Sequence, residues 1–227
     1  MKLLLTSSGI SNRSIEDALA GLLGKPIAES SALIVPTAIY PFAEGPSNAW
    51  RLINGKAQGP LAEVGWKSLG VLELTALPSI DRESWVPLLK ETDALLVWGG
   101  HVMYLCHWMR QSGLAELLPS LDNLVYVGVS AGSIVTTPYN GDVEFNLRTL
   151  PAGSEATREG DRALGLVDFT LRVHVDREGF NSMDDVEAWA AAIPVPTYAI
   201  DDETAIRVVD GRPEVVSEGN WKLFEPG

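Results

Sequence analysis

The stretch Leu124–Val135, LVYVGVSAGSIV, decides the fold of this 227-residue chain. An apolar run leads through Gly128 to Ser130, and a second glycine, Gly132, follows two residues later. A short continuous apolar run that ends in such residues is typical of a strand buried on both faces of a parallel sheet. The glycines predict a tight turn after this strand, and a helix is expected to begin at Ala131.

The same alternation of apolar runs and amphipathic segments fills the chain before this stretch. The predicted strands are residues 2–7, 32–36, 69–74, 94–98 and 124–129. The predicted helices are residues 14–23, 46–65, 81–92, 102–111 and the segment from residue 131. Short strands that alternate with helices indicate an α/β fold with a mostly parallel, doubly wound sheet and helices on both faces.

The pattern loosens after Pro138. Residues 139–165 are polar and rich in glycine, and they are expected to form a loop-rich crossing. Beyond them we predict a helix over 182–193 and strands over 169–175, 197–201, 204–211 and 213–219, with the last two strands joined as a β-hairpin at the sequence DGRP. Neither a repeat nor a linker separates these segments, so residues 1–227 are expected to form a single α/β domain.

Composition excludes several partners. The formal charge is −13, from 17 basic and 30 acidic residues, so the chain lacks the basic footprint that nucleic-acid binding needs. The longest uncharged apolar stretch, residues 94–109, is shorter than a membrane span, which predicts no membrane partner. The one cysteine, Cys106, cannot form an intramolecular disulfide, which favours a cytoplasmic location. We expect a monomer or a homodimer.

The sequence GVSAG at residues 128–132 matches G-x-S-x-G, the elbow that exposes a nucleophilic serine at the end of a strand. This pattern makes Ser130 a candidate nucleophile. The alternative interpretation is a tight turn with a serine that only caps the helix. A nucleophilic serine also needs a base to remove its proton at neutral pH, and histidine is the usual base.

Three histidines are available as that base. His101 and His107 are six residues apart near one predicted helix and face different sides of it, and Cys106 does not complete a ligand set with them. We therefore expect neither a metal site nor a cofactor. His174 lies late in the predicted strand 169–175, downstream of the elbow, and is the best candidate for the base.

Four sequence blocks together carry a resemblance to a known family. They are LLVWGG at residues 95–100, GVSAGS at residues 128–133, the histidine His174, and AIDDETAI at residues 199–206. With these blocks in this order, the chain resembles the serine peptidases of family S51, which include peptidase E (aspartyl dipeptidase) and cyanophycinase. The resemblance implies a sheet related to that of class I glutamine amidotransferases and the cleavage of small acidic peptides without a metal ion.

The resemblance also implies a catalytic triad. Ser130 corresponds to the nucleophile, His174 to the base and Asp202 to the acid that orients the imidazole. The backbone N–H of Ala131, at the start of a helix, is a suitable donor to the oxyanion. The N–H of Gly100 corresponds to the second oxyanion donor of the family.

Residue-level alternatives to this triad stay open. Asp142 would suit the chain order serine, acid, histidine of the α/β-hydrolases, whereas Asp202 gives the order serine, histidine, acid. Asp201 and Glu203 adjoin Asp202 and are further candidates for the acid. His101 stands where the family usually has asparagine, beside the expected oxyanion site.

The segment after the proposed base bears on substrate choice. Family members of the peptidase E type place basic residues there to bind an aspartate side chain, but residues 175–189 hold five acids and one arginine, Arg177. If the strand of His174 continues, Arg177 lies on its opposite face and points away from the site. The sequence therefore predicts weak cleavage of dipeptides with an N-terminal aspartate.

Taken together, the residues indicate a serine hydrolase of the peptidase E type that cleaves short peptides through an acyl-enzyme. Two alternatives remain at this point. One is an esterase or amidase with the same triad. The other is a non-catalytic binding protein that retains the elbow as structure.

Overall fold

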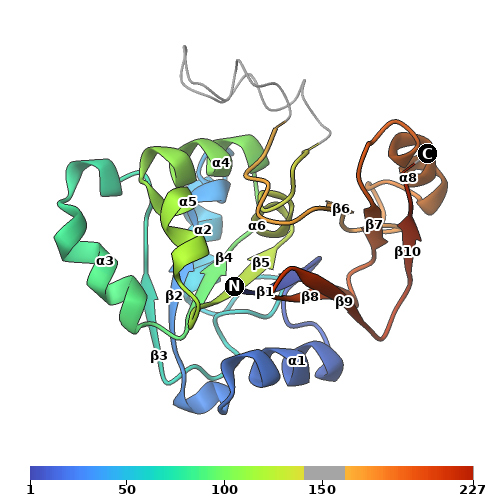
Figure 1. Ribbon diagram of the computed structural model, residues 1–227. Coiled ribbons are helices and arrows are strands. Elements are labelled where there is room, and N and C mark those ends of the chain that lie inside the picture. The colour runs from blue at the N-terminus through green and yellow to red at the C-terminus, as the bar shows by residue number, and fades with distance from the viewer. Residues whose placement is uncertain (141–161, 227) are drawn as a thin grey trace.

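The computed structural model describes residues 1–140 and 162–226. Its main feature is a seven-stranded sheet with the strand order β3-β2-β4-β5-β1-β8-β9 (Figure 1). The strands are β1 (Lys2–Thr6), β2 (Ser31–Val35), β3 (Ser68–Val71), β4 (Ala94–Val97), β5 (Val125–Val129), β8 (Thr204–Val209) and β9 (Arg212–Ser217). Strands β1 to β5 run parallel. Strand β8 pairs antiparallel with β1, and β9 pairs antiparallel with β8. These pairings confirm the predicted mostly parallel α/β sheet.

Helices cover both faces of this sheet. They are α1 (Arg13–Leu23), α2 (Gly45–Ile53), α3 (Arg82–Glu91), α4 (Val102–Gln111), α5 (Leu114–Leu117) and α6 (Ala131–Ile134). Short 3-10 helices occur at Ile27–Glu29, Thr37–Ile39, Leu77–Ser79 and Leu118–Ser120. In Figure 1, α1 lies below the sheet, α3 lies to its left and α4 lies above it. No helix in the described parts of the chain is both long and apolar enough to cross a bilayer.

Side chains that alternate along the interior strand β1 pack against the helices on both faces of the sheet. Leu4 belongs to the apolar cluster that includes Leu19 of α1. Leu5 belongs to the opposite cluster, which includes Leu105 of α4. Because successive side chains of a strand point to opposite faces, a short apolar run can supply both cores at once.

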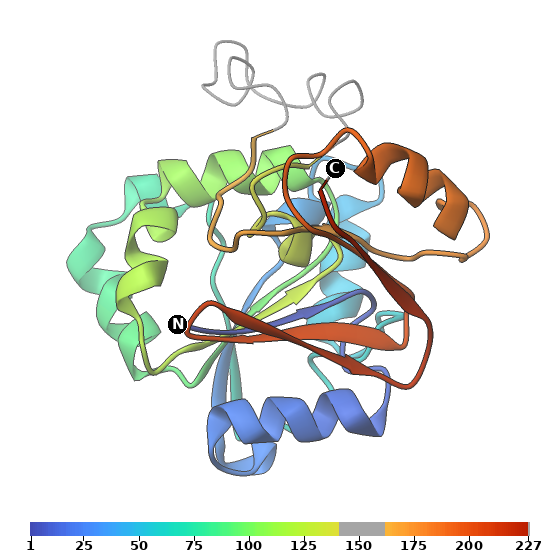
Figure 2. The same ribbon diagram turned by 45° about the vertical axis from the view of Figure 1, so that its right-hand side comes forward.

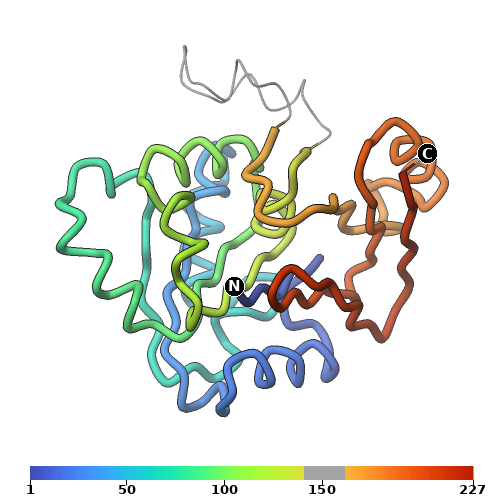
Figure 3. The backbone as a smooth tube through the Cα atoms, viewed as in Figure 1, coloured from blue at the N-terminus to red at the C-terminus, as the bar shows by residue number. Residues whose placement is uncertain are grey.

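A second, smaller sheet lies beside the first. It consists of β6 (Thr170–Arg172), β7 (Thr197–Ile200) and β10 (Trp221–Phe224) in the order β10-β7-β6, and α8 (Met183–Ala190) packs near it. In Figure 3 this segment lies at the right of the molecule, with the C-terminus on it and the N-terminus near the middle, and Figure 2 shows the same segment turned toward the viewer. Because β7 continues into β8 and β9 continues into β10, two short crossings, at residues 201–203 and 218–220, join the two sheets.

The hairpin predicted near the C-terminus is confirmed. Strands β8 and β9 pair antiparallel, and the two residues between them, Asp210 and Gly211, have φ angles of 50° and 77°. Positive φ at both central residues is the geometry of a type I′ turn, for which Asp-Gly is a favoured sequence.

Several predicted elements end earlier than expected; the strand predicted over 69–74 ends at Val71 and the helix predicted over 182–193 ends at Ala190. The helix predicted over 46–65 is wrong beyond Ile53, where α2 ends, because Gly55 takes a left-handed φ of 63°. The strand predicted over 169–175 is wrong beyond Arg172, because His174 has a φ of 56°, outside the extended region. Most of the expected loop-rich crossing, 139–165, lies outside the described residues.

Gly132 brings the turn after β5 into close contact with β4. A Cβ atom at this position would lie 2.0 Å from the backbone oxygen of Val97. The carbonyl of Gly132 accepts a hydrogen bond from the buried hydroxyl of Tyr126 at 2.6 Å. Only glycine fits this approach, which fixes the position of the residues just before it.

Replacing this glycine should therefore destabilise the fold. We expect Gly132→Ala to lower the free energy of unfolding by about 1–3 kcal/mol, the usual effect of overpacking. The matched control is Gly21→Ala on α1, where no atom lies within 4 Å of an added Cβ. That substitution should stabilise the protein by roughly 0.5–1 kcal/mol because alanine favours the helix. Urea unfolding measures both, and equal effects would contradict the packing argument.

Candidate active site

Ser130 lies at the carboxyl end of β5, in the turn that leads into α6. Its backbone has φ 51° and ψ −113°, a conformation that residues other than glycine rarely adopt. The N–H of Ser130 donates to the carbonyl oxygen of Thr6 at 3.1 Å, which ties the turn to the neighbouring strand β1. A strained serine in a strand-to-helix turn is the geometry of a nucleophile elbow.

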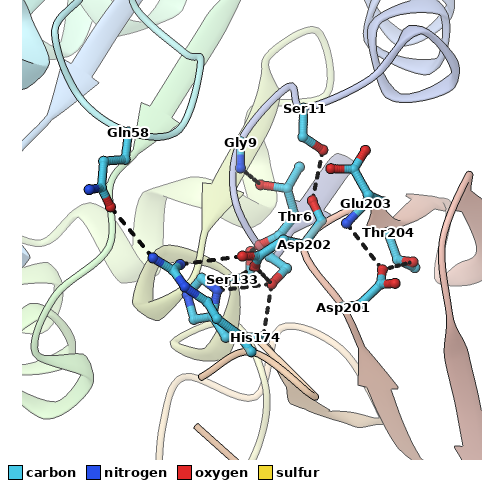
Figure 4. Close-up of polar contacts among 12 residues, drawn as sticks. Thr6, Gly9, Ser11, Gln58, Ser133, His174, Asp201, Asp202, Glu203 and Thr204 are labelled. Atoms are coloured by element: carbon cyan, nitrogen blue, oxygen red, sulfur yellow. Dashed lines mark hydrogen bonds and ion pairs between the residues drawn. The ribbon is translucent and has the colours of Figure 1, made fainter. Parts of the chain in front are cut away.

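His174 and Asp202 contact each other directly (Figure 4). The Nδ1 atom of His174 lies 2.5 Å from Oδ1 of Asp202. His174 follows β6 of the small sheet, whereas Asp202 lies in the crossing between β7 and β8. The pair thus joins two segments that are distant in sequence, and it leaves Nε2 of the imidazole for another partner.

The electrostatics of this pair favour a neutral imidazole and an ionised carboxyl. Burial lowers the pKa of His174, and the charge of Arg177 acts in the same direction, although the hydrogen bond and charge of Asp202 oppose both. Burial acts to raise the pKa of Asp202, but hydrogen bonds from His174 and Ser7 and nearby positive charge lower it overall. A neutral imidazole can accept a proton, which is what a general base must do.

The other carboxyl groups considered for the acid have different contacts. Asp201 accepts hydrogen bonds from the N–H of Glu203 at 3.1 Å and from the hydroxyl of Thr204 at 2.7 Å, and also from the N–H of Asn220. The carboxyl of Glu203 accepts from the side-chain amide of Asn12 at 3.1 Å. Figure 4 shows Asp201 apart from His174. Asp142 lies outside the described residues.

The residues expected around an oxyanion lie near Ser130. Ala131 begins α6, where the first N–H groups of a helix lack intrahelical acceptors. Gly100 lines the same pockets as Ser130 and has a φ of 142°, and a Cβ there would lie 2.2 Å from the oxygen of Ala38. The ring of His101 caps α4, because its Nδ1 accepts the N–H of Tyr104 at 3.2 Å.

Two pockets meet at Ser130, His174 and Gly100, which line both. One has a volume of about 210 Å³ and is called here the Trp98 pocket; its other lining residues include Trp98, Ile39, Gln58 and Arg177. The other has a volume of about 300 Å³ and is called here the Phe180 pocket; its other lining residues include Phe180, Val102, Ile134, Asn140 and Arg172. A small molecule could therefore extend to either side of the serine.

The sequence-based prediction that Arg177 points away from the site is wrong. The chain turns after β6, with the N–H of Arg177 bonded to the carbonyl of His174, so Arg177 lines the Trp98 pocket. Its guanidinium donates to Oδ2 of Asp202 at 3.3 Å and to Oε1 of Gln58 at 3.5 Å. The positive charge of Arg177 is thus engaged with the carboxylate of Asp202.

Sequence reasoning missed Ser7, the residue just after β1. Its hydroxyl lies 2.8 Å from Oδ1 of Asp202, and it accepts the backbone N–H of His174 at 2.9 Å. The position of Ser7 at the carboxyl end of a predicted strand was the available signal, because side chains at that edge of a parallel sheet surround ligands.

The arrangement suits acyl transfer better than metal chemistry. Among residues 1–140 and 162–226, no three His, Cys, Asp or Glu side chains gather in a cluster that could hold a metal ion. The site instead offers a serine hydroxyl, a neutral buried imidazole and a carboxylate beside it. These are the groups that serine hydrolases use.

Comparison with known proteins identifies the class. The model of peptidase family S51 matches residues 3–216, and the chain belongs to this family. The family match makes this chain a serine-type peptidase. No curated protein matches the sequence at a significant level.

Two solved structures show the same fold. A peptidase from an acI-B1 Actinobacterium is 17% identical with a TM-score of 0.67, and the match covers 100% of this chain and 94% of that one. A candidate peptidase E protein from Listeria monocytogenes EGD-e is 19% identical with a TM-score of 0.60, and the match covers 96% of this chain and 98% of that one.

The contacts of the two adjacent aspartates predict different roles. Asp201→Ala should lower the free energy of unfolding by about 1–3 kcal/mol, because its partners in the β7–β8 crossing lose their acceptor. The control Glu203→Gln keeps an acceptor at an exposed position and should change the free energy by less than about 0.5 kcal/mol. Thermal or urea unfolding compares them, and an unchanged stability of Asp201→Ala would contradict this assignment.

Proposed function

We propose that the protein hydrolyses short peptides through a Ser130–His174–Asp202 triad and an acyl-enzyme. The observation that carries the proposal is the 2.5 Å contact between Nδ1 of His174 and Oδ1 of Asp202, in a site where His174 and Ser130 line the same two pockets. Membership of peptidase family S51 supports the peptide bond as the bond that is cleaved.

In the proposed reaction, Nδ1–H of His174 donates to Asp202, and Nε2 accepts the proton of the Ser130 hydroxyl. The Ser130 oxygen attacks the peptide carbonyl, and the imidazolium then gives its proton to the leaving amine as the C–N bond breaks. Water repeats these steps on the ester, with His174 again as base, and releases the acid product and free Ser130. The carboxylate of Asp202 stabilises the imidazolium and keeps one tautomer.

Two backbone N–H groups are proposed to stabilise the oxyanion. The N–H of Ala131 lies in the first turn of α6, and the N–H of Gly100 lies three residues after the end of β4. Donors that are fixed in place before the reaction lower the barrier most, because they need no reorganisation as charge develops. The strained backbone at Ser130 and the close approach of Gly100 to the backbone of Ala38 fit such fixed positions.

Replacing members of the triad should abolish hydrolysis without unfolding the protein. We expect Ser130→Ala and His174→Ala each to lower kcat by about 10⁴-fold or more, with the double variant losing little beyond either single one. Asp202→Asn should lower kcat by about 10⁴-fold, because it favours the wrong tautomer of His174. The assay is dipeptide hydrolysis, with Glu203→Gln as the control that retains activity.

Labelling of Ser130 by a fluorophosphonate probe separates the alternatives. A binding protein that retains the elbow only as structure would not label, whereas a peptidase and an esterase both would. Comparison of peptide and ester substrates then separates those two enzymes. Full activity in Ser130→Ala would refute the serine mechanism.

The charges in the site bear on which peptides fit. In the Trp98 pocket the guanidinium of Arg177 already donates to the carboxylate of Asp202. A substrate carboxylate that approached Arg177 would therefore lie beside a second negative charge. In the Phe180 pocket the cation is Arg172, whose guanidinium stacks over Trp189 at 3.8 Å and donates to the carbonyl of Asn140 at 3.5 Å. We propose that peptides with a neutral N-terminal residue are preferred, because a carboxylate without a dedicated cation costs several kcal/mol to bury.

This preference can be measured with matched dipeptides. We expect kcat/KM for Asp-Leu to be at least about tenfold below that for the isosteric Asn-Leu, a difference of about 1.4 kcal/mol. Ala-Leu serves as a second neutral substrate. Efficient cleavage of Asp-Leu that is lost in Arg172→Ala or Arg177→Ala would contradict the proposal and identify the arginine that receives the carboxylate.

A further inference from the structure

Ser7 stands at the meeting point of three structural elements. It follows the last residue of β1, its side chain is fully buried, and it reaches both the residue after β6 and the crossing between β7 and β8. Its hydroxyl lies 2.8 Å from Oδ1 of Asp202, 2.9 Å from the backbone nitrogen of His174 and 3.3 Å from Nδ1 of the same histidine.

The chemistry of a hydroxyl fixes the direction of these contacts. A serine hydroxyl has one proton to donate and lone pairs to accept with. The backbone N–H of His174 is a donor only, so Ser7 accepts from it, and the ionised carboxylate of Asp202 is an acceptor only, so Ser7 donates to it. Oδ1 of Asp202 therefore receives two hydrogen bonds, from Ser7 and from His174.

These bonds hold strained parts of the site. The backbone of His174 has a φ of 56°, which costs a non-glycine residue about 1 kcal/mol or more. The N–H of this strained residue is bonded to Ser7, so the hydroxyl fixes the backbone as well as the carboxylate that orients the ring. The other oxygen of Asp202 is held by Arg177 at 3.3 Å, with a side chain that is 41% exposed. Apart from His174, Ser7 is thus the buried one of the two side chains that bond to the carboxylate of Asp202.

We propose that Ser7 is a positioning residue of the hydrolytic reaction, and that it holds Asp202 and His174 in the geometry in which His174 can take the proton of Ser130. This inference rests on the proposed function. Ser7 acts through the pair rather than on the reacting bond.

Loss of the hydroxyl should affect catalysis in a way that a general loss of stability does not. In Ser7→Ala the imidazole loses its fixed orientation, and a small misplacement of a reacting group lowers rates by about tenfold to a hundredfold. We expect kcat to fall by that factor with KM changed less than about threefold, because the hydroxyl of Ser7 is engaged with Asp202 and His174 rather than free to bind substrate.

The pH profile provides the sharper measurement. kcat/KM should rise with pH as His174 loses its proton, since only neutral imidazole accepts one. The hydrogen bond from Ser7 offsets part of the negative charge of Asp202, and its removal strengthens the attraction between that carboxylate and imidazolium. The pKa of His174 should then rise, so the ascending limb should move to higher pH in Ser7→Ala.

Ser11→Ala is the matched control. The hydroxyl of Ser11 donates to the backbone carbonyl of Asp202 at 2.8 Å and so supports the same crossing without touching the carboxylate. Ser11→Ala should leave the ascending limb of the kcat/KM profile at the pH where it lies in the wild type. Ser7→Thr keeps a hydroxyl and should recover the position of the limb and most of kcat.

Each result decides the question. Wild-type kcat and an unmoved limb in Ser7→Ala, or an equal shift in Ser11→Ala, would overturn the role of Ser7. If Ser7→Ala does not fold, Ser7→Cys decides, because a thiol is a weak donor of similar size; it should lose kcat and shift the limb, and wild-type behaviour would overturn the proposal. Activity in Ser130→Ala, measured alongside, would instead refute the proposed function itself.

Discussion

Hydrogen bonds at the carboxyl end of β1 hold the site together. The carbonyl of Thr6 accepts from the N–H of Ser130 at 3.1 Å and from the hydroxyl of Ser133 at 2.7 Å, and the next residue, Ser7, bonds to Asp202. Strand β1 lies between β5, which leads to Ser130, and β8, which follows Asp202. Two strand spacings separate these neighbours, about 10 Å. That distance is too long for a direct contact between serine and carboxylate, and an imidazole is the right size to bridge it.

Burial sets the protonation state of this imidazole. It lowers the pKa of His174, and Arg177 adds to this effect, although Asp202 opposes both. The imidazole is therefore kept neutral and able to accept a proton, while the adjacent carboxylate is kept ionised, as the proposed reaction requires. Arg177, which the sequence predicted to point away from the site, is instead bonded to the carboxylate of Asp202.

The features that depend on residues close together in the sequence were predicted. The five parallel strands were predicted because each is a short apolar run, and Ser130 because its turn is encoded within residues 128–132. Residues of β6 and β7 were predicted as strands, but their pairing with β10 in a separate sheet was not, since the pairing of distant strands is non-local. The direction of Arg177 was wrong because nothing in the sequence indicates the left-handed backbone at His174. Ser7 was missed because a serine after a strand is an ordinary sequence feature.

The crossings between the sheets have a mechanical consequence. Asp202 lies in the three residues that connect β7 of the small sheet to β8 of the large one, and residues 218–220 form a second connection of the same length between β9 and β10. The two crossings are bonded to each other, because the N–H of Asp201 donates to the carbonyl of Asn220 at 3.1 Å. Ser130 follows β5 of the large sheet, whereas His174 follows β6 of the small one, so the distance between the hydroxyl and the imidazole depends on how the two sheets lie against each other. A pair of bonded crossings resists rotation of one sheet against the other better than a single connection, and it therefore keeps that distance constant.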